Sequence, residues 1–186
     1  MEKKYVAKLE EIVEKLKTAD TREAFRILHR LQYGPFLENA GRSLVKQDFS
    51  LNKNKAIILL THAITQQKHG FTVDLVRGFS IAWFNSKKRK TKIIFLAIDC
   101  SNMKKVEMKI AHTGKHNGSL NFDDKVTPPP AELKAIVDGL EGFTEQKPGL
   151  WIRPLGEVRN LAQAKRLIKP VWDAVYNAIA PFGNFW

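Results

Sequence analysis

Residues 92–99 read KIIFLAID, and the six central residues, 93–98, are all apolar. A run of Ile, Phe, Leu and Ala without polar alternation predicts a strand in the middle of a sheet, with both faces covered. Two further strands are predicted beside it, at residues 71–84 and 106–111. In the second of these, Glu107 and Lys109 alternate with apolar residues, so the two charged side chains share one face.

Helical patterns surround these strands. Asp20 predicts the N-cap of the second helix, and Pro170 predicts a kink or a new start within the last one. A short strand is predicted at residues 150–153, ended by Pro154, and a further hairpin is predicted around Asn117-Gly118. Apolar residues recur at helical spacing in six segments, at about residues 5–16, 24–31, 35–46, 56–68, 133–140 and 160–180.

The expected fold class is α+β, with a central mixed or antiparallel sheet of about four strands flanked by helices and an N-terminal helical segment. A chain of 186 residues suits one domain. The composition changes near residue 50, which predicts an N-terminal helical segment over residues 1–50. This segment is either separate from the rest of the chain or part of the same domain. Residues 51–186 are then an α/β core with C-terminal helices.

The charge balance points to a polyanionic partner. The chain has 31 Lys and Arg residues against 19 Asp and Glu, a formal net charge of +12. Such an excess repels itself in a compact fold, and phosphate backbones offset it best because each neutralised phosphate releases counterions. We therefore expect nucleic acid as the partner, DNA ahead of RNA, with a merely basic soluble protein as the alternative.

Other features narrow the setting and the function classes. No apolar run approaches the roughly 20 residues that span a bilayer, so no membrane partner is expected. The single Cys100 cannot form an internal disulfide and has no evident activating partner. We expect a cytoplasmic location, or a nuclear one in a eukaryote, where the basic run at 87–90 could act as an import signal.

Phosphate-loop, Rossmann and serine-elbow patterns are absent, which argues against ATP-driven, nicotinamide-dependent and triad-hydrolase functions.

Basic residues at two predicted turns are the candidates for contact with nucleic acid. A loop between the first two strands carries five positive charges above the aromatic Trp83, and a basic pair follows at the next turn. Such loops can track phosphates, although a solvated hairpin tip that deters aggregation is the ordinary alternative. The predicted nucleic-acid-binding residues are Trp83, Lys87, Lys88, Arg89, Lys90, Lys92, Lys104 and Lys105.

Aromatic residues offer a second mode of binding. The four tryptophans, Trp83, Trp151, Trp172 and Trp186, could line one pocket in which an unpaired base stacks, or they could belong to the core. The apolar residues 181–186 either fold back onto the body or dock on a protein partner, and the N-terminal helices are another candidate for a partner or dimer contact. His62 lies in a buried helix pattern and is expected to be a core residue.

Three charged residues form the sharpest candidate for catalysis. If residues 101–105 form the turn, Asp99 lies directly across from Glu107, and Lys109 shares their face. Carboxylate oxygens are the ligands that Mg²⁺ prefers, and a nearby ammonium can orient water or stabilise charge on a phosphate. The alternative is an exposed strand face with alternating charges, which is the ordinary reason for this pattern.

The pattern Asp99, Glu107, Lys109 resembles that of the PD-(D/E)xK nuclease superfamily, and the predicted order of helix, three strands, helix and strand over residues 56–153 matches its core. The resemblance covers about half of the chain, and Ile98 stands where a proline is often found. It implies Mg²⁺-dependent hydrolysis of phosphodiesters, with Asp99 and Glu107 as metal ligands and Lys109 as the third catalytic residue. The residues thus leave two functions open: a nucleic-acid-binding protein without a cofactor, and a Mg²⁺-dependent endonuclease.

Overall fold

The computed structural model describes residues 3–32, 53–65, 70–74, 78–86, 92–113 and 126–184. Its strands are β1 (Gly70–Asp74), β2 (Phe79–Ser86), β3 (Lys92–Asp99), β4 (Val106–His112), β5 (Thr144–Lys147), β6 (Leu150–Gly156) and β7 (Gly183–Asn184). Its α-helices are α1 (Lys3–Thr18), α2 (Thr21–Gln32), α3 (Lys53–Thr65), α4 (Ala131–Asp138) and α5 (Leu161–Ile179). The predicted helix at 35–46 and the predicted hairpin at Asn117-Gly118 lie outside the described residues.

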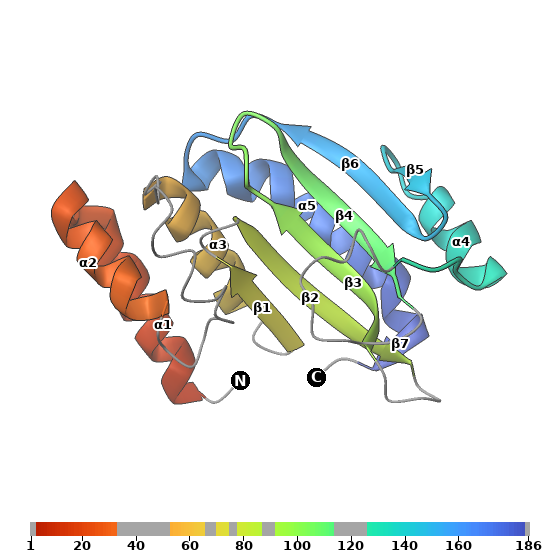
Figure 1. Ribbon diagram of the computed structural model, residues 1–186, viewed down its shortest axis with the longest axis horizontal. Coiled ribbons are helices and arrows are strands. Elements are labelled where there is room, and N and C mark those ends of the chain that lie inside the picture. Colours follow the sequence, from red (N-terminus) through yellow and green to blue (C-terminus); the bar gives the residue numbers. More distant parts are fainter. Residues whose placement is uncertain are drawn as a thin grey trace.

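The seven strands form one sheet in the order β1-β2-β3-β4-β6-β5, with β7 paired to the end of β2. Every pairing is antiparallel (Figure 1). The predicted α+β class, with its sheet flanked by helices and its N-terminal helical segment, is confirmed. The sheet has more strands than the four or so expected, because a polar strand, β5, and the short β7 carry little sequence signal.

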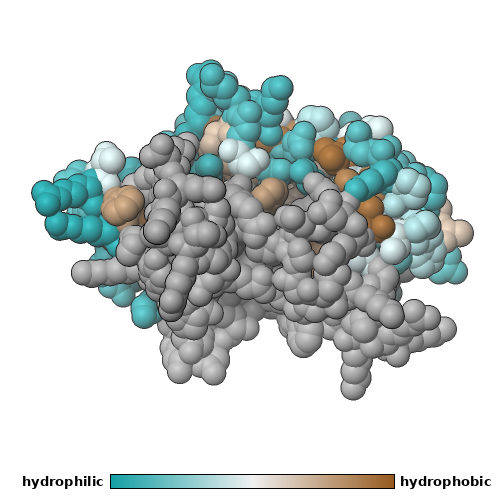
Figure 2. Space-filling model, viewed as in Figure 1, coloured by the Kyte–Doolittle hydropathy of each residue, from teal (hydrophilic) through white to brown (hydrophobic). Residues whose placement is uncertain are grey.

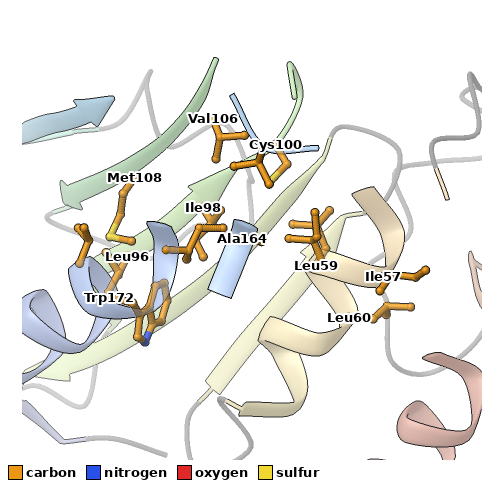
Figure 3. Packing of buried hydrophobic residues seen from close by; sticks show 14 of the residues in the cluster. Ile57, Leu59, Leu60, Leu96, Ile98, Cys100, Val106, Met108, Ala164 and Trp172 are labelled. Atoms are coloured by element: carbon orange, nitrogen blue, oxygen red, sulfur yellow. The ribbon is translucent and has the colours of Figure 1, made fainter. Parts of the chain in front are cut away.

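β3 lies in the middle of the sheet, and its apolar run is buried on both faces as predicted. Ile94, Leu96 and Ile98 belong to a large cluster that includes side chains of α3 and α5. Phe95 and Ala97 point to the opposite face and belong to a second, smaller cluster. Figure 3 shows the larger cluster, in which residues of the sheet meet Leu59 of α3 and Trp172 of α5.

The N-terminal helices pack against α3. Leu9, Val13 and Leu16 of α1 are buried in the same cluster as Ile57 and Leu60 of α3, so the core extends across the composition change near residue 50. The start of α2 forms as predicted, because the Asp20 carboxylate accepts a hydrogen bond of 2.8 Å from the Glu23 backbone N–H. An N-cap of this kind is worth about 1 kcal/mol.

The predicted strand at 71–84 is wrong in one respect, because it is two strands. A turn containing Gly78 separates β1 from β2. Gly78 has a φ of 87°, and a Cβ there would lie 2.8 Å from the Ser101 backbone nitrogen. A side chain at this position is therefore excluded. The sequence did not reveal this, because Gly78 is only a single glycine within an apolar run.

Pro154 behaves differently from the prediction, and at Pro170 one of the two predicted outcomes does not occur. Pro154 does not end β6, which continues to Gly156 and pairs Pro154 with Glu107 of β4. Pro154 has no N–H to donate to a neighbouring strand. This is tolerated because β5, on the other side of β6, pairs only with residues 150–152 and does not reach Pro154. Pro170 lies inside the single helix α5, so no second helix begins there.

The C-terminal segment folds back onto the body, which was one of its two predicted fates. A short 3-10 helix (Ala180–Phe182) follows α5, and β7 then pairs Gly183 and Asn184 with Ser86 and Asn85 of β2. Within the part of the chain that the structure describes, no helix combines the length and the apolar character needed to cross a membrane.

Candidate nucleic-acid interface

The predicted register of the β3–β4 hairpin is confirmed. Asp99 lies directly opposite Glu107, and Lys109 lies opposite Ala97 on the same face as both carboxylates. The turn between them is held by Asn102, whose side-chain oxygen accepts the Lys104 N–H at 3.0 Å and whose carbonyl accepts the Lys105 N–H at 2.9 Å. The hairpin therefore brings the three charged residues together.

Lys109 is paired with Asp99 in a nearly buried ion pair. The Lys109 Nζ lies 2.8 Å from Asp99 Oδ2, and the two side chains are only 11% and 10% exposed. Glu107 is further away, with its Oε2 at 3.8 Å from the same Nζ, and its side chain is 33% exposed. The second oxygen of Asp99, Oδ1, accepts hydrogen bonds from the Ser101 N–H at 2.9 Å and the Ser101 hydroxyl at 2.6 Å. Both oxygens of Asp99 are thus engaged.

This arrangement fits an ion pair better than a magnesium site. The Lys109 ammonium occupies the place next to both carboxylates that a divalent cation would take. A metal ion bound by Asp99 and Glu107 would have to displace it. Among the described residues, no group of three or more His, Cys, Asp or Glu is placed to hold a metal ion.

The turn of the same hairpin carries Lys104 and Lys105, both exposed. The turn is joined to the segment before α5, because the Val158 N–H donates to the Met103 carbonyl at 2.8 Å. That segment is in turn joined to the start of α3, where the Asn54 side-chain amide donates to the Arg159 carbonyl at 3.1 Å. Figure 1 shows these three chain segments together at the upper left of the molecule.

We name residues 53–55, 101–105 and 157–160 the turn surface. It contains five cations and one acid, Glu157, a net charge of +4. The cations are Lys53, Lys55, Lys104, Lys105 and Arg159. Glu157 pairs with Arg159 at 2.8 Å, and this guanidinium lowers the pKa of the Glu157 carboxyl. Figure 2 shows hydrophilic residues along the upper edge of the molecule, where this turn lies.

The sequence prediction missed Lys53, Lys55 and Arg159, although α3 gave a signal. Lys53 and Lys55 stand in the first turn of that helix, which has no acidic residue there. The N-terminus of a helix already carries a partial positive charge, so lysines in its first turn are unfavourable unless an anion offsets them. Lys53 also donates to the Ala19 carbonyl at 2.9 Å, which ties it to the end of α1.

Of the other predicted binding residues, the main chains of Lys92 and Trp83 are described, and both lie away from the turn surface. Lys92 begins β3, whereas the turn surface follows its end, about 20 Å away for a strand of this length. The main chain of Trp83 pairs with Gly70 and Phe95 in the sheet. The remaining residues of the basic loop, Lys87, Lys88, Arg89 and Lys90, lie outside the described residues.

The two tryptophans whose side chains the structure describes, Trp151 and Trp172, belong to the core, which was the alternative to a shared pocket. Trp151 is fully buried, and its indole N–H donates to Asp138 at 2.9 Å, so its ring is not open to a base. Trp172 is buried under the sheet and packs edge-on against His62, with ring centroids 4.2 Å apart. Trp186 and the side chain of Trp83 lie outside the described residues.

Burial controls the titration of two residues near the core. It raises the pKa of the Cys100 thiol to about 12, with the neighbouring Asp99 carboxylate adding to the effect, so the thiol is protonated at neutral pH. It also lowers the pKa of His62 to about 3. The His62 Nδ1 lies 3.0 Å from the Ser80 hydroxyl, and the burial of the ring agrees with the predicted core position.

The pKa of His62 predicts a loss of stability in mild acid. Since the folded pKa of about 3 is below the usual 6.5, the unfolded chain binds the proton more readily between these values. The free energy of unfolding should therefore fall by up to roughly 1 kcal/mol per pH unit as pH decreases from 6.5. Urea unfolding at pH 6.5 and 5 should show this slope in the wild type and a smaller one in His62→Gln. Equal slopes would contradict the prediction.

Comparison with known proteins found no matching family model, no matching curated protein and no matching solved structure. The resemblance to the PD-(D/E)xK superfamily therefore stays a prediction, based on the residues and the strand order alone. An inference about the function of this protein therefore rests on its fold class and on the geometry of the site.

Proposed function

We propose that this protein binds nucleic acid, with the turn surface as a phosphate-binding region. The observation that carries this proposal is the excess of five cations over one acid in three segments that hydrogen bonds hold together. Lys104 and Lys105 are the exposed centre of this surface, on a turn with a defined conformation. DNA is the first ligand to test.

Four lysines on the described helices differ from the turn surface in their charge balance, because each stands next to an acid one helical turn away. These i,i+3 and i,i+4 pairs are Lys15–Glu11, Lys17–Glu14, Lys134–Asp138 and Lys169–Asp173. Such pairs neutralise one another locally, whereas residues 101–105, which carry Lys104 and Lys105, contain no acid. This contrast supports a role for the turn surface in binding a polyanion.

The first turns of α3 and α5 strengthen the positive potential of the turn surface. Both helices begin within it, and their N-terminal dipole ends add partial positive charge next to the lysines. Phosphate contacts of this kind do not read the base sequence. We therefore expect binding with weak sequence preference and strong dependence on salt.

Neutralising the central lysines should weaken binding and flatten its salt dependence. In Lys104→Gln/Lys105→Gln, the slope of log K against log salt should fall by about 2, since each lost phosphate contact removes about 0.9. Affinity for a random duplex of about 20 base pairs should fall at least tenfold at about 0.1 M salt. Fluorescence anisotropy across a salt series measures both quantities.

The control variant is Lys15→Gln/Lys17→Gln on α1, which removes the same charge from lysines that are already paired with acids. It should leave the affinity within about twofold of the wild type. An equal loss in both double variants would show that net charge alone drives binding. An absence of duplex, single-strand and RNA binding by the wild type would overturn the proposal. A third double variant, Lys88→Gln/Lys90→Gln, tests the basic loop separately.

A metal-dependent nuclease is the second candidate, supported by the register that places Asp99 opposite Glu107. We rank it below binding because Lys109 and Ser101 engage both oxygens of Asp99. Plasmid incubated with Mg²⁺ distinguishes the two. Nicking by the wild type and not by Glu107→Ala would support the nuclease, and intact plasmid with retained binding would support a binding protein.

A further inference from the structure

A cavity lies between α3 and α5, the two helices that cover one face of the sheet. Its volume is about 450 Å³, within the range of roughly 300–1,000 Å³ that is typical of small-molecule sites. Much of its wall is aliphatic and consists of Ile58 of α3 and Leu161, Ala164 and Ile168 of α5. Leu161 is partly exposed, whereas the other three side chains are buried. Leu161 is therefore the most accessible part of this aliphatic wall.

The cavity begins where the turn surface ends. On α5, Leu161 directly follows Asn160, the last residue of the turn surface. On α3, Lys55 stands three residues before Ile58, which places the two side chains one helical turn apart on the same side of the helix. The Asn54 side chain joins the starts of the two helices by its hydrogen bond to the segment before α5. Figure 1 shows both helices beginning at the same end of the molecule and running along the sheet. A strand bound at the turn surface would therefore meet the cavity next.

Positive charge continues from the turn surface along the rim of the cavity. From residue 158 to residue 172 the chain has four cations and no acid. Two of these cations, Lys165 and Lys169, line the cavity, and Lys169 is paired with Asp173. Lys165 is exposed and takes part in no ion pair within the described part of the chain. It stands one helical turn beyond Leu161, so an available cation lies beside the apolar wall.

An apolar wall beside an available cation fits a single strand of nucleic acid better than a duplex. In a duplex the faces of the bases are stacked inside, and a basic surface meets mainly phosphates and sugars. A single strand exposes the faces of its bases, which leave water against an apolar wall while the phosphates meet lysines. A cavity in the size range of small-molecule sites also has room for an unpaired base.

We propose that the cavity binds an unpaired base of a single-stranded nucleic acid whose phosphates lie on the turn surface. Leu161 contacts the base, and Lys165 contacts the phosphate next to it. Since aliphatic side chains make no hydrogen bonds to base edges, we expect little preference among the four bases. This inference rests on the proposed nucleic-acid binding and adds the strandedness of the ligand.

The test compares three probes of about 12 nucleotides, a length within the usual range of single-strand sites. They are oligo(dT), an abasic deoxyribose-phosphate chain and a duplex of the same length. The first two have the same charge and differ only in their bases. By fluorescence anisotropy at about 0.1 M salt, the wild type should bind oligo(dT) about tenfold more tightly than the abasic chain. It should also bind oligo(dT) more tightly than the duplex, although the duplex has twice as many phosphates.

Leu161→Ser reduces the apolar wall without changing the charge. It should lower the affinity for oligo(dT) about fivefold and leave the affinities for the abasic chain and the duplex within about twofold of the wild type. Leu161→Met keeps an apolar side chain of similar size and should bind all three probes like the wild type. Unchanged binding of the duplex by Leu161→Ser also shows that this variant is folded.

Lys165→Gln should lower the slope of log K against log salt for oligo(dT) by about 0.7, the value for one phosphate contact of a single strand. The matched control is Arg166→Gln, which removes the same charge from the exposed neighbour outside the cavity wall and should change the slope less. An equal change in both variants would contradict a contact at Lys165.

Equal affinity of the wild type for oligo(dT) and the abasic chain would overturn the inference, as would full affinity of Leu161→Ser for oligo(dT). The first comparison needs no variant, so it decides the matter even if Leu161→Ser does not fold. The turn surface would still stand in that case, provided that Lys104→Gln/Lys105→Gln weakens binding of the duplex. Failure of the nucleic-acid proposal looks different, because none of the three probes would then bind.

Discussion

Gly149→Ala should destabilise the protein by about 4 kcal/mol or more, because strain and overpacking add at this position. Gly149 has a φ of 90°, and a Cβ there would lie 2.2 Å from the Thr127 carbonyl oxygen, a backbone atom that cannot rotate away. The glycine is also held from two sides, since its N–H donates to Glu145 and its carbonyl accepts the His112 N–H at 2.8 Å. The chain cannot shift without breaking the link between β4, the β5–β6 turn and the segment before α4.

Gly156→Ala is the matched control for this prediction. Gly156 has nearly the same φ, 89°, but no atom lies within 4 Å of the position of its Cβ. Its substitution should therefore cost only the backbone term, about 1 kcal/mol. Urea unfolding followed by tryptophan fluorescence gives both values. Similar losses in the two variants would mean that φ alone matters and that the close approach to Thr127 is absent in solution.

Lys109→Met should lower the free energy of unfolding by about 3 kcal/mol, because it leaves the Asp99 carboxylate buried without its countercharge. Methionine keeps most of the length of the side chain, so the loss reports on charge more than on packing. Asp99 retains only its hydrogen bonds from Ser101. Equilibrium unfolding in urea at neutral pH measures the effect.

Two further variants identify the source of that loss. Glu107→Gln should change stability by no more than about 0.5 kcal/mol, because Glu107 is a third exposed and lies 3.8 Å from the ammonium. Asp99→Asn/Lys109→Met should be more stable than the sum of the single changes predicts, since the double variant removes both buried charges. If Lys109→Met costs no more than Glu107→Gln, the pair is not buried as described.

The hairpin shows how far sequence reasoning reached into the candidate site. Strand periodicity and a five-residue turn were enough to place Asp99 opposite Glu107, because side chains alternate along a strand with a period of two. The same pattern did not reveal that Asp99 is buried and bound by Ser101 and Lys109. Burial depends on which segments cover the strand, and those segments are distant from it in the sequence.

The turn surface and the cavity show the opposite case. Lys104 and Lys105 were visible as a basic turn, but Lys55 and Arg159 are about 50 residues away on either side of the chain and meet them only through the packing of α3 and α5. Thr61 and Trp172 lie on different helices and share a cavity only because both helices cover the same face of the sheet.

The α+β class, the buried central strand, the cap at Asp20 and the hairpin register could be predicted from the amino-acid pattern alone, because each depends on a few neighbouring residues and on backbone geometry. The pairing of buried charges and the glycines that admit no side chain became visible only in the three-dimensional structure. These features depend on contacts between residues far apart in the chain, and the physical reason is that desolvation and close packing act on whatever the fold brings together.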